Sequence, residues 1–527
     1  MIRFYLLAMG AFLALGLLPK SHRLMNALAS GNALLHLLLT CAALLTLDLP
    51  VRYGPSLYLD HLNLYVELIT ALGFCAAAPY AKGYTESLME EGELDPKNLK
   101  LFYLAFNLLL VTATAALFSD NLALFWIFAE LTTVCAAVLV AILSARENID
   151  AGLKYVFIVS GAMLFAFLGL IFLFTLSARA LGEGTLSWTE LMEHASSFSP
   201  ALLLASFAFV FIGFGAKAGI APFHTWLPDA YARAPSVSAI LSGLMQNLGI
   251  YGILRTYALL RVSDSAPQAS FILIAAGLFS IALAAFSMLQ QRNLKRLIAF
   301  SSVEHMGLLL IGIGIGTPLA LFWALFYMLI HVLVKEALLF AAGILHRQYG
   351  SNLREDVRDV FELQPHAAWT LVLGSIAIVG MPPFPLFPAK FFILLESAAV
   401  SPYLTLAVLL LLILAAAAFA NFLLNAFSRV TKEKTATEEG KGEGKEEKKG
   451  ETRGETRGER EREHGKETKH RKKSHQSHQN HQNRYTVKAW MKIPMLLMLA
   501  LALLLGIWFP EQLKELLEAI VLELGYV

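Results

Sequence analysis

Runs of apolar residues recur along almost the whole chain, and they restrict its fold more than any other feature. A helix needs about 20 apolar residues to cross the hydrocarbon core of a bilayer. Fourteen runs in the 527 residues match or approach that length, and we therefore predict an all-α polytopic membrane protein. The runs are 3–18, 24–47, 59–80, 99–118, 120–143, 152–176, 201–226, 236–260, 270–288, 296–316, 318–345, 367–400, 402–427 and 490–509.

Composition agrees with a membrane protein. Hydrophobic residues make up 57% of the chain and charged residues only 16%, whereas a soluble domain is about a quarter charged. The net charge of +2 gives no indication of nucleic-acid binding. Cys41, Cys75 and Cys135 lie in apolar runs without CxxC spacing, so we interpret them as small core residues rather than metal or iron–sulfur ligands. No small-residue cleavage signature precedes Pro19, which favours a retained first helix over a signal peptide.

The distribution of basic residues predicts the orientation. Loops after odd-numbered runs hold most of the Lys and Arg, whereas loops after even-numbered runs hold only Arg52, Arg179 and Arg261. Short loops rich in Lys and Arg stay in the cytoplasm. We therefore expect the odd-numbered loops inside and both termini outside.

Two segments near the C-terminus differ from the rest. Residues 431–484 contain GETRGETRGER repeats and HQSHQNHQN but no large apolar side chain before Tyr485, which predicts a disordered, charged cytoplasmic loop. Its histidines could bind a metal ion, but a solvated low-complexity tract is the favoured interpretation. Beyond the last run, apolar residues on one helical face predict an amphipathic helix on the outer leaflet. That face holds Leu513, Leu516, Leu517, Ile520, Val521 and Leu524.

A lysine occurs in an interrupted apolar run. Lys217 lies within Gly213-Phe-Gly-Ala-Lys-Ala-Gly-Ile-Ala-Pro-Phe-His-Thr-Trp-Leu-Pro-Asp229, where Gly and Pro should break the helix. An ammonium inside hydrocarbon costs a few kcal/mol or more, so such a residue indicates a functional site. Broken backbone at that depth is tolerated only where it is buried in protein or lines a wet cavity. A second interruption, Met381-Pro-Pro-Phe-Pro-Leu-Phe-Pro-Ala-Lys390, carries another lysine.

These features also suggest an internal repeat. Phe214-Gly-Ala-Lys217 is echoed 173 residues later by Phe387-Pro-Ala-Lys390, and Glu130 is echoed 174 residues later by Glu304. Spans four to eight and nine to thirteen would then be two five-helix units in opposite orientations, each with one broken helix. We predict segments 1–98 (three helices), 99–260 (first repeat), 261–430 (second repeat), 431–484 (charged loop) and 485–527 (last span and amphipathic helix).

The charged residues inside the spans suggest a path for protons. Glu130 is interpreted as the partner of Lys217, because two lone buried charges cost more than a pair; a neutral, hydrogen-bonded acid is the alternative. At about 4 Å and an effective dielectric near 20, such a pair interacts by roughly 4 kcal/mol. A nearby Glu130 would therefore keep the lysine protonated, and separation would favour release of its proton.

Other ionisable residues could extend this path. His331 and Lys335 are four residues apart, hence on one helical face, and fit a relay better than an isolated polar contact. Lys390 is a candidate terminal carrier, with a lysine that snorkels to the interface as the alternative. His224 could equally extend the path or cap broken backbone, and Glu336 remains unassigned.

Four motifs resemble one protein family. They are GFGAKAGIAPFHTWLPDAYARAPSVSAILSG (213–243), LKRLIAFSSVEHMG (294–307), HVLVKEALLFAAG (331–343) and MPPFPLFPAK (381–390). Together they resemble the antiporter-like subunits of respiratory complex I, Mrp-type Na+/H+ antiporters and energy-converting [NiFe] hydrogenases. The sequences of these motifs are most similar to those of hydrogenase-4 component F and formate-hydrogenlyase membrane subunits.

The resemblance implies fourteen helices, two inverted repeats and ion translocation driven by redox chemistry in partner subunits. It assigns the key glutamate to Glu130, the broken-helix lysine to Lys217, the relay to His331 and Lys335, and the exit lysine to Lys390. No Cys cluster, P-loop or strand-borne GxGxxG supports redox chemistry in this chain. Iron–sulfur clusters and NiFe are therefore expected in partner subunits, with no cofactor or metal here.

The chain departs from the family at two positions. Many relatives have a lysine in the eighth span, whereas this chain has Gln246 and Asn247, and Asn293 replaces an aspartate before LKRL. Neither Gln246 nor Asn247 carries a charge, so a proton would cross there through water or the path would end.

We therefore expect a proton- or cation-translocating subunit of a hydrogenase or formate-hydrogenlyase type complex in a prokaryotic plasma membrane. Its partners would be other membrane subunits, a peripheral redox arm and lipid, but no nucleic acid. The alternatives are a subunit of a Mrp-type antiporter or of a complex I type NADH dehydrogenase. A structural membrane scaffold with vestigial charges is a further alternative.

Overall fold

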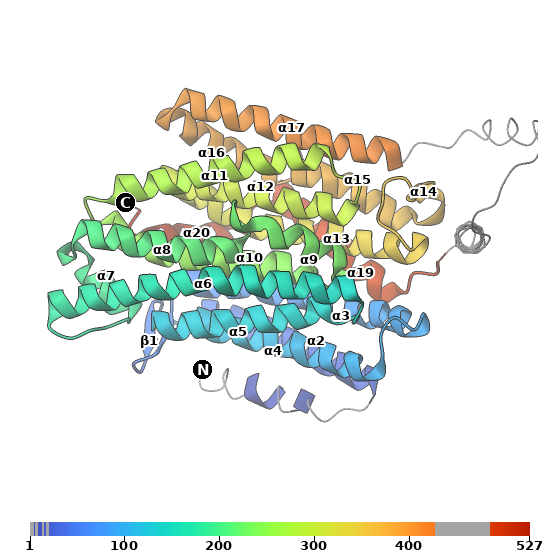
Figure 1. Cartoon of the computed structure of the whole chain (residues 1–527), viewed down its shortest axis with the longest axis horizontal. Coiled ribbons are helices and arrows are strands. Elements are labelled where there is room, and N and C mark those ends of the chain that lie inside the picture. The colour runs from blue at the N-terminus through green and yellow to red at the C-terminus, as the bar shows by residue number, and fades with distance from the viewer. Residues whose placement is uncertain (1–4, 6–8, 13–14, 17–20, 427–484, 527) are drawn as a thin grey trace, which may run out of the picture.

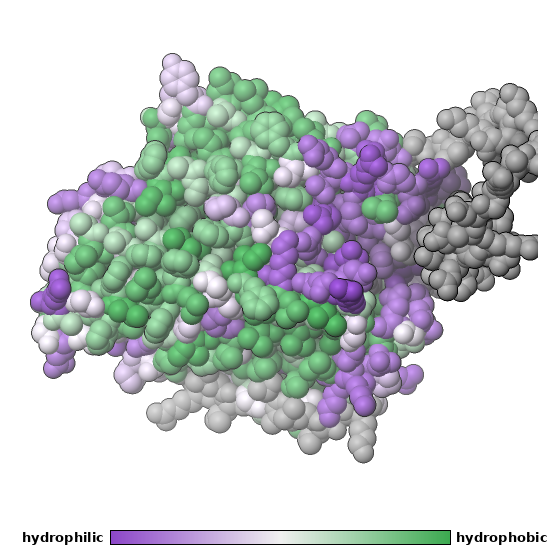
Figure 2. Space-filling model, viewed as in Figure 1, coloured by the Kyte–Doolittle hydropathy of each residue, from purple (hydrophilic) through white to green (hydrophobic). Residues whose placement is uncertain are grey.

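Long helices run side by side, roughly parallel to the longest axis of the molecule (Figure 1). The computed structural model describes residues 5, 9–12, 15–16, 21–426 and 485–526. Within these residues, twelve helices are long and apolar enough to cross a membrane. Figure 2 shows hydrophobic residues over the middle of the visible face and hydrophilic residues toward both ends. A helix bundle that spans a bilayer requires this distribution, because lipid covers only the middle.

The long helices are joined in chain order by loops and by shorter elements. The long helices are α2 (His22–Thr46), α3 (His61–Glu90), α4 (Pro96–Leu117), α5 (Leu122–Ala141), α6 (Arg146–Leu181), α8 (Pro200–Ala218), α10 (Ile240–Arg261), α11 (Ala266–Leu289), α12 (Leu294–Ile315), α13 (Pro318–Tyr349), α17 (Pro402–Ala426) and α19 (Ala489–Ile507). The short elements are the hairpin β1 (Val51–Tyr53) and β2 (Leu57–Leu59), helices α7 (Trp188–His194), α9 (Leu227–Arg233), α14 (Val360–Leu363), α15 (Pro365–Val379), α16 (Leu386–Val400) and α20 (Glu511–Glu523), and the 3₁₀ turns η1 (Ala195–Ser197), η2 (Phe223–Trp226) and η3 (Ser236–Ala239).

The all-α prediction is confirmed. Every predicted run from 24–47 to 402–427, and the run 490–509, coincides with a long helix or with two half-helices. The first run, 3–18, lies mostly outside the described residues, and the charged loop 431–484 lies outside them entirely. The count of fourteen spans and the inverted repeats therefore stay predictions.

Both predicted interruptions are real breaks. α8 ends at Gly219, which has a φ of +77°, and the chain continues through η2 into α9. α15 ends at Gly380, which has a φ of +88°, and α16 starts six residues later at Leu386. Glycine is favoured at both helix ends because it adopts the left-handed conformation without a Cβ clash. Lys217 precedes its break and Lys390 follows its break, so the two sequence echoes do not occupy matching places relative to the breaks.

Three helices form the centre of the bundle. In the most apolar 18-residue windows of α10 and α13 every residue is buried, and in α12 94% are buried. The corresponding share is only 28% for α17, which forms one edge of the bundle in Figure 1. Glu304 on α12 and Lys335 and Glu336 on α13 are therefore surrounded by protein rather than by lipid.

The C-terminal amphipathic helix forms where it was predicted, but its apolar face packs against protein instead of lipid. The apolar face of α20 packs against α3 and α13 and buries Leu517, Ile520 and Val521. Glu523 accepts a hydrogen bond from His61 at the start of α3, with Nδ1 and Oε1 2.6 Å apart. The expected lipid-facing helix is thus docked on the protein, because α3 and α13 offer it an apolar surface.

We predict that an ion pair between α10 and α3 is essential for stability. Arg255 donates two hydrogen bonds of 2.6 and 2.7 Å to Asp60, the N-cap of α3, and both side chains are almost completely buried. Arg255→Ala would leave the aspartate buried and unpaired, at a cost of about 3 kcal/mol or more. Arg146→Ala is the matched control, since Arg146 is 93% exposed, its partner Asp150 is 68% exposed, and such a surface pair should contribute about 1 kcal/mol or less. Equal thermal stability of the two purified variants in detergent would contradict this prediction.

Candidate functional site

Buried ionisable side chains extend across the centre of the bundle, on α8, α12, α13 and α16. Lys217, His331 and Lys335 are completely inaccessible, Glu304 is 3% exposed and Lys390 is 7% exposed. The predicted residues of the second half lie together, because Glu304 contacts Lys390 directly. Those of the first half approach one another less closely.

Lys217, at the C-terminal end of α8, bonds to α5. Its ammonium donates to the carbonyl of Ala129 and the hydroxyl of Thr133, both at 2.7 Å. The predicted direct ion pair with Glu130 is therefore not formed in this structure. Adjacent residues on a helix point about 100° apart, so the backbone of Ala129 faces Lys217 while the side chain of Glu130 turns toward α6.

Glu130 has one partner of its own. Its Oε2 accepts a hydrogen bond of 2.7 Å from Ser160 on α6, and its Oε1 has no hydrogen-bond partner among the described residues. Lys217 is thus held by neutral oxygens beside an incompletely bonded carboxyl group. Formation of the predicted pair would require a movement of at least one of these side chains, as in a switch.

In the second half, α12 and α13 hold the predicted relay. Lys335 donates a 2.7 Å hydrogen bond to the carbonyl of Ile298 and also bonds to the hydroxyl of Ser301. His331, one turn along α13, has no hydrogen-bond partner for either ring nitrogen among the described residues. Its ring lies edge-on to that of His305, with 5.1 Å between the ring centroids.

His305 is a site residue that sequence reasoning missed. It is completely buried on α12, its Nδ1 bonds to the Tyr327 hydroxyl, and its Nε2 lies 3.6 Å from Glu304 Oε2. It therefore lies between His331 and the acid. The motif Ser-Val-Glu-His contained the signal, but only the packing of α12 against α13 shows that the two histidines meet.

Lys390 completes this series. Its ammonium lies 3.2 Å from Glu304 Oε1, and it also donates to the last carbonyls of α15, Ile378 at 3.2 Å and Val379 at 3.1 Å. Free carbonyls at a helix C-terminus attract cations. The second break thus supplies the partners that keep a lysine charged inside the bundle, and the side chain does not extend to the surface.

Between the two halves, α10 carries the polar residues that replace the usual lysine. Gln246 donates a 3.2 Å hydrogen bond to the carbonyl of Ala218, next to Lys217. Asn247 is completely buried, and both polar atoms of its side chain lack partners among the described residues. His224 on η2 is buried and forms no hydrogen bond with a lysine among the described residues. Trp226, not His224, donates a 2.9 Å hydrogen bond to the carbonyl of Ala216 near the break.

Glu336 is a further buried residue, to which the sequence analysis assigned no role. It is completely buried on α13, and neither carboxyl oxygen has a hydrogen-bond partner in the described part of the chain. A Cβ placed on Gly73 of α3 would lie 2.4 Å from its Oε1, and one on Gly243 of α10 would lie 3.5 Å away. Two glycines therefore make room for this carboxyl group between α3, α10 and α13, one turn from Asn247.

A polar cavity of about 450 Å³ opens toward the site from one end of the bundle. Its lining includes Glu93, Glu147, Lys295 and His346. Glu93, which lies between α3 and α4, has a raised pKa, because burial raises its pKa more than the nearby Arg347 lowers it. Lys295 precedes Ile298, the carbonyl partner of Lys335, by about one turn of α12, so the cavity lining reaches to within one helical turn of that partner.

The arrangement suits proton transfer. The described residues contain no group of three or more His, Cys, Asp and Glu side chains that could hold a metal ion. They do contain buried lysine, histidine and carboxyl groups on neighbouring helices, with hydroxyl groups and amides among them. Such groups can accept and release protons in turn.

Comparisons with known proteins place this site in a family. The transmembrane family of NADH:quinone oxidoreductase and Mrp antiporter matches residues 119–415. A hydrogenase-4 component F homolog from Methylacidiphilum infernorum is 37% identical over 67% of this chain and 74% of its own length. Hydrogenase-4 component B from Escherichia coli is 30% identical over 62% of this chain and 49% of its own length. A chain of the archaeal membrane-bound sulfane sulfur reductase (MBS) superimposes with a TM-score of 0.78 at 20% identity, covering 98% of this chain and 96% of that one.

We predict that substitutions of Lys390 and Glu304 have coupled effects on the stability of the protein. Lys390→Met leaves a buried carboxylate unpaired and should lower stability by about 3 kcal/mol. Adding Glu304→Gln removes that unpaired charge, so the double variant should be more stable than Lys390→Met alone. Thermal unfolding of the two single variants and the double variant measures the coupling. Strictly additive losses would show that the two side chains do not interact.

Proposed function

We propose that this chain, which belongs to the family of transmembrane subunits of NADH:quinone oxidoreductases and Mrp antiporters, moves protons across the membrane as one subunit of a larger complex. The carrying observation is a buried series of ionisable groups on α12, α13 and α16. His331, one turn of α13 from Lys335, lies edge-on to His305, whose Nε2 is 3.6 Å from the Glu304 carboxyl of the Glu304–Lys390 pair. A purely structural scaffold would gain nothing from burying so many ionisable groups, each of which is costly to keep away from water.

The first half would act as the switch. Lys217 bonds only neutral oxygens in this structure, while Glu130 keeps one oxygen free. Moving the glutamate next to the ammonium would hold the proton on Lys217, and moving it away would favour proton release. An electrical or conformational event in a neighbouring subunit could drive this movement, because a charge displaced inside a low-dielectric interior acts over a long range.

Glu336 would carry the proton across α10, where this chain lacks the usual lysine. α10 packs between α8 and α13, with Gln246 bonded beside Lys217 and Gly243 next to the Glu336 carboxyl. The two free oxygens of Glu336 and the free amide of Asn247 need hydrogen-bond partners, and water is the partner that buried polar groups of this kind usually have. A carboxyl group with water on the α10 side can relay a proton between Lys217 and Lys335.

The transported ion would be the proton. Charged lysines repel cations and cannot ligate Na+, whereas lysines, histidines and carboxyl groups all exchange protons. His224, which forms no hydrogen bond with a lysine among the described residues, would serve the fold at the first break. Both termini would lie outside, so the charged loop 431–484 would be cytoplasmic.

The complex would be of the hydrogenase or formate-hydrogenlyase type, in a prokaryotic plasma membrane. Both relatives described above are named as hydrogenase-4 components. Iron–sulfur clusters and NiFe would lie in a peripheral redox arm formed by other subunits. A Mrp-type antiporter is the second candidate, favoured by the family description itself. Neighbouring genes for hydrogenase subunits, or for small antiporter subunits, would separate the two.

The role of Lys217 is the first test of this function. Lys217→Ala should reduce proton uptake by inverted vesicles that hold the whole complex about 100-fold or more, because a positioned acid–base group contributes at least that much. Lys514→Ala is the matched control, because Lys514 is 43% exposed and pairs only with Glu511 on the surface. Normal uptake in an assembled Lys217→Ala complex would rule out the switch.

Glu336 supplies a second test. Glu336→Gln keeps the shape of the side chain between Gly73 and Gly243 but cannot exchange a proton, so uptake should fall while thermal stability is kept or improved. Glu336→Asp should retain part of the uptake. If Glu336→Gln pumps at the normal rate, the proton crosses α10 without this residue.

A further inference from the structure

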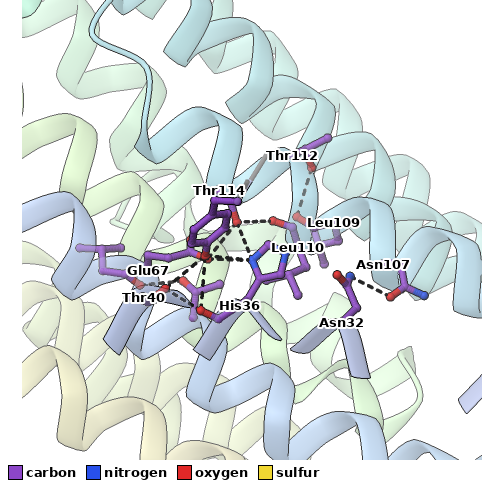
Figure 3. Close-up of polar contacts among 12 residues, drawn as sticks. Asn32, His36, Thr40, Glu67, Asn107, Leu109, Leu110, Thr112 and Thr114 are labelled. Carbon is purple, nitrogen blue, oxygen red and sulfur yellow. Dashed lines mark hydrogen bonds and ion pairs between the residues drawn. The ribbon is translucent and has the colours of Figure 1, made fainter. Parts of the chain in front are cut away.

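A second series of buried polar residues lies in the N-terminal helices α2, α3 and α4. These helices precede the family match at residues 119–415, and none of the residues described so far contributes to the series. Figure 3 shows its inner part, where side chains from the three helices converge. His36 on α2 and Glu67 on α3 form its centre, and both are completely buried.

Three groups approach the same oxygen of Glu67. Its Oε1 lies 3.0 Å from His36 Nδ1, 2.9 Å from the Thr114 hydroxyl and 3.1 Å from the Tyr5 hydroxyl. Thr40 bonds to Tyr5 at 3.1 Å and closes the group on the α2 side. These are the titratable and polar groups that face the carboxyl: His36 and Thr40 from α2, Tyr5 from the preceding segment and Thr114 from α4.

The remaining polar atoms of the pair have no partner. Glu67 Oε2 and His36 Nε2 are buried without a hydrogen bond to any described residue. A glutamate kept only to join helices should have both oxygens bonded, because an unbonded buried oxygen costs about 1–3 kcal/mol. The pair therefore presents one free acceptor on the acid and one free nitrogen on the base, which are the atoms that a transferred proton needs.

Polar side chains continue from this pair along the same helix faces. One turn along α2, Asn32 donates a 3.0 Å hydrogen bond to Asn107 of α4, and its own Oδ1 is unpaired in the described chain. Farther along, Asn26 donates to the Tyr103 hydroxyl at 3.2 Å. Asn107 and Tyr103 are four residues apart on α4 and hence on one face.

The series ends at the surface. The Tyr103 hydroxyl lies 3.1 Å from His22 Nε2, and His22 Nδ1 lies 3.6 Å from Glu86. Glu86 is 26% exposed and pairs with Lys488, at the start of α19, at 3.0 Å. Nineteen residues of α3 separate Glu67 from Glu86, or about 28 Å at a rise of about 1.5 Å per residue. The series thus extends over nearly the thickness of a hydrocarbon core, about 30 Å.

We propose that these side chains form a second proton path, in which Glu67 and His36 bind a proton that arrives from the Glu86 end. His36 would take up a proton at Nε2 and release the proton at Nδ1 to Glu67, and the reverse transfer with rotation of the ring restores the starting state. No bond other than N–H and O–H forms or breaks, and the proton number balances at each step.

This path is separate from the series on α12 and α13. The opposite face of α3 contacts α13, where Tyr65 and Tyr80 donate hydrogen bonds to the carbonyls of Leu325 and Phe340. That face also holds Gly73, which packs against Glu336. The side of α3 that carries Glu67 therefore points away from Glu336 and Lys335, and no hydrogen bond among the described residues joins the two series.

Infrared spectroscopy of the purified complex tests the proton-binding site directly. As the pH is lowered, a carboxyl C=O band should appear in wild type and be absent from Glu67→Gln. In D₂O this band should shift as the proton exchanges. Asn107→Leu, which replaces an amide in the middle of the path, should abolish the shift over the time in which wild type exchanges completely. The band of Glu336, assigned with Glu336→Gln, is the matched control and should exchange equally in both proteins.

Transport by the same complex in sealed vesicles provides the second readout. The inference rests on the proposed function, and the variants distinguish the two: Lys217→Ala tests the switch, whereas Glu67→Gln tests the second path. Glu67→Gln should cause a partial loss of proton uptake that Glu67→Asp restores, with assembly checked by thermal stability. A Glu67 band that never appears or does not exchange overturns the proposal. Unchanged uptake in assembled Glu67→Gln overturns it equally, while lost uptake in Lys217→Ala would leave the proposed function intact.

Discussion

A charge removed from water must be given partners, and the lysine beside each helix break of this protein has them. A lysine buried inside a bundle is stable only beside a carboxylate or several oxygens with suitable geometry. Lys390 obtains both, from Glu304 and from the carbonyls at the end of α15. Lys217 obtains a backbone carbonyl and a hydroxyl from α5. The two sites are thus alike in purpose and different in chemistry, one ionic and one neutral.

The difference suggests distinct roles for the two halves. The ionic site around Lys390 has a fixed geometry, and its partners lie within a compact series on α12 and α13. The neutral site around Lys217 has a nearby carboxyl group that is only half bonded. The first half could therefore change its pairing, whereas the second half holds its ionisable groups close together on adjoining helices. α10, with uncharged amides at its centre, separates them.

Much of this could be predicted from the sequence because it depends on local patterns. The lengths of apolar runs gave the helices, and Gly and Pro near Lys217 and Lys390 gave both breaks. Contacts between helices could not be predicted in the same way. The packing of α13 against α12, α3 and α10 brings His305 and Glu336 to the site, and this packing is not visible in the sequence. Glu130 follows Ala129 by one residue on α5, so its side chain projects in a different direction from the Ala129 carbonyl that Lys217 binds. The apolar face of α20 was predicted correctly, but protein rather than lipid covers it. The hydrophobicity of a helix face does not show which of the two will cover it.

The bonds of Lys390 link chemistry to mechanics. Its ammonium holds an acid on α12 and the end of α15 at the same time, so it works as a latch between two helices. A neutral amine still has N–H groups for the carbonyls of Ile378 and Val379, but it offers no charge to an ionised Glu304. Loss of one proton would then loosen the latch on one side only. No separate gate is then needed, because the proton carried by Lys390 also determines whether Lys390 stays bonded to Glu304 on α12.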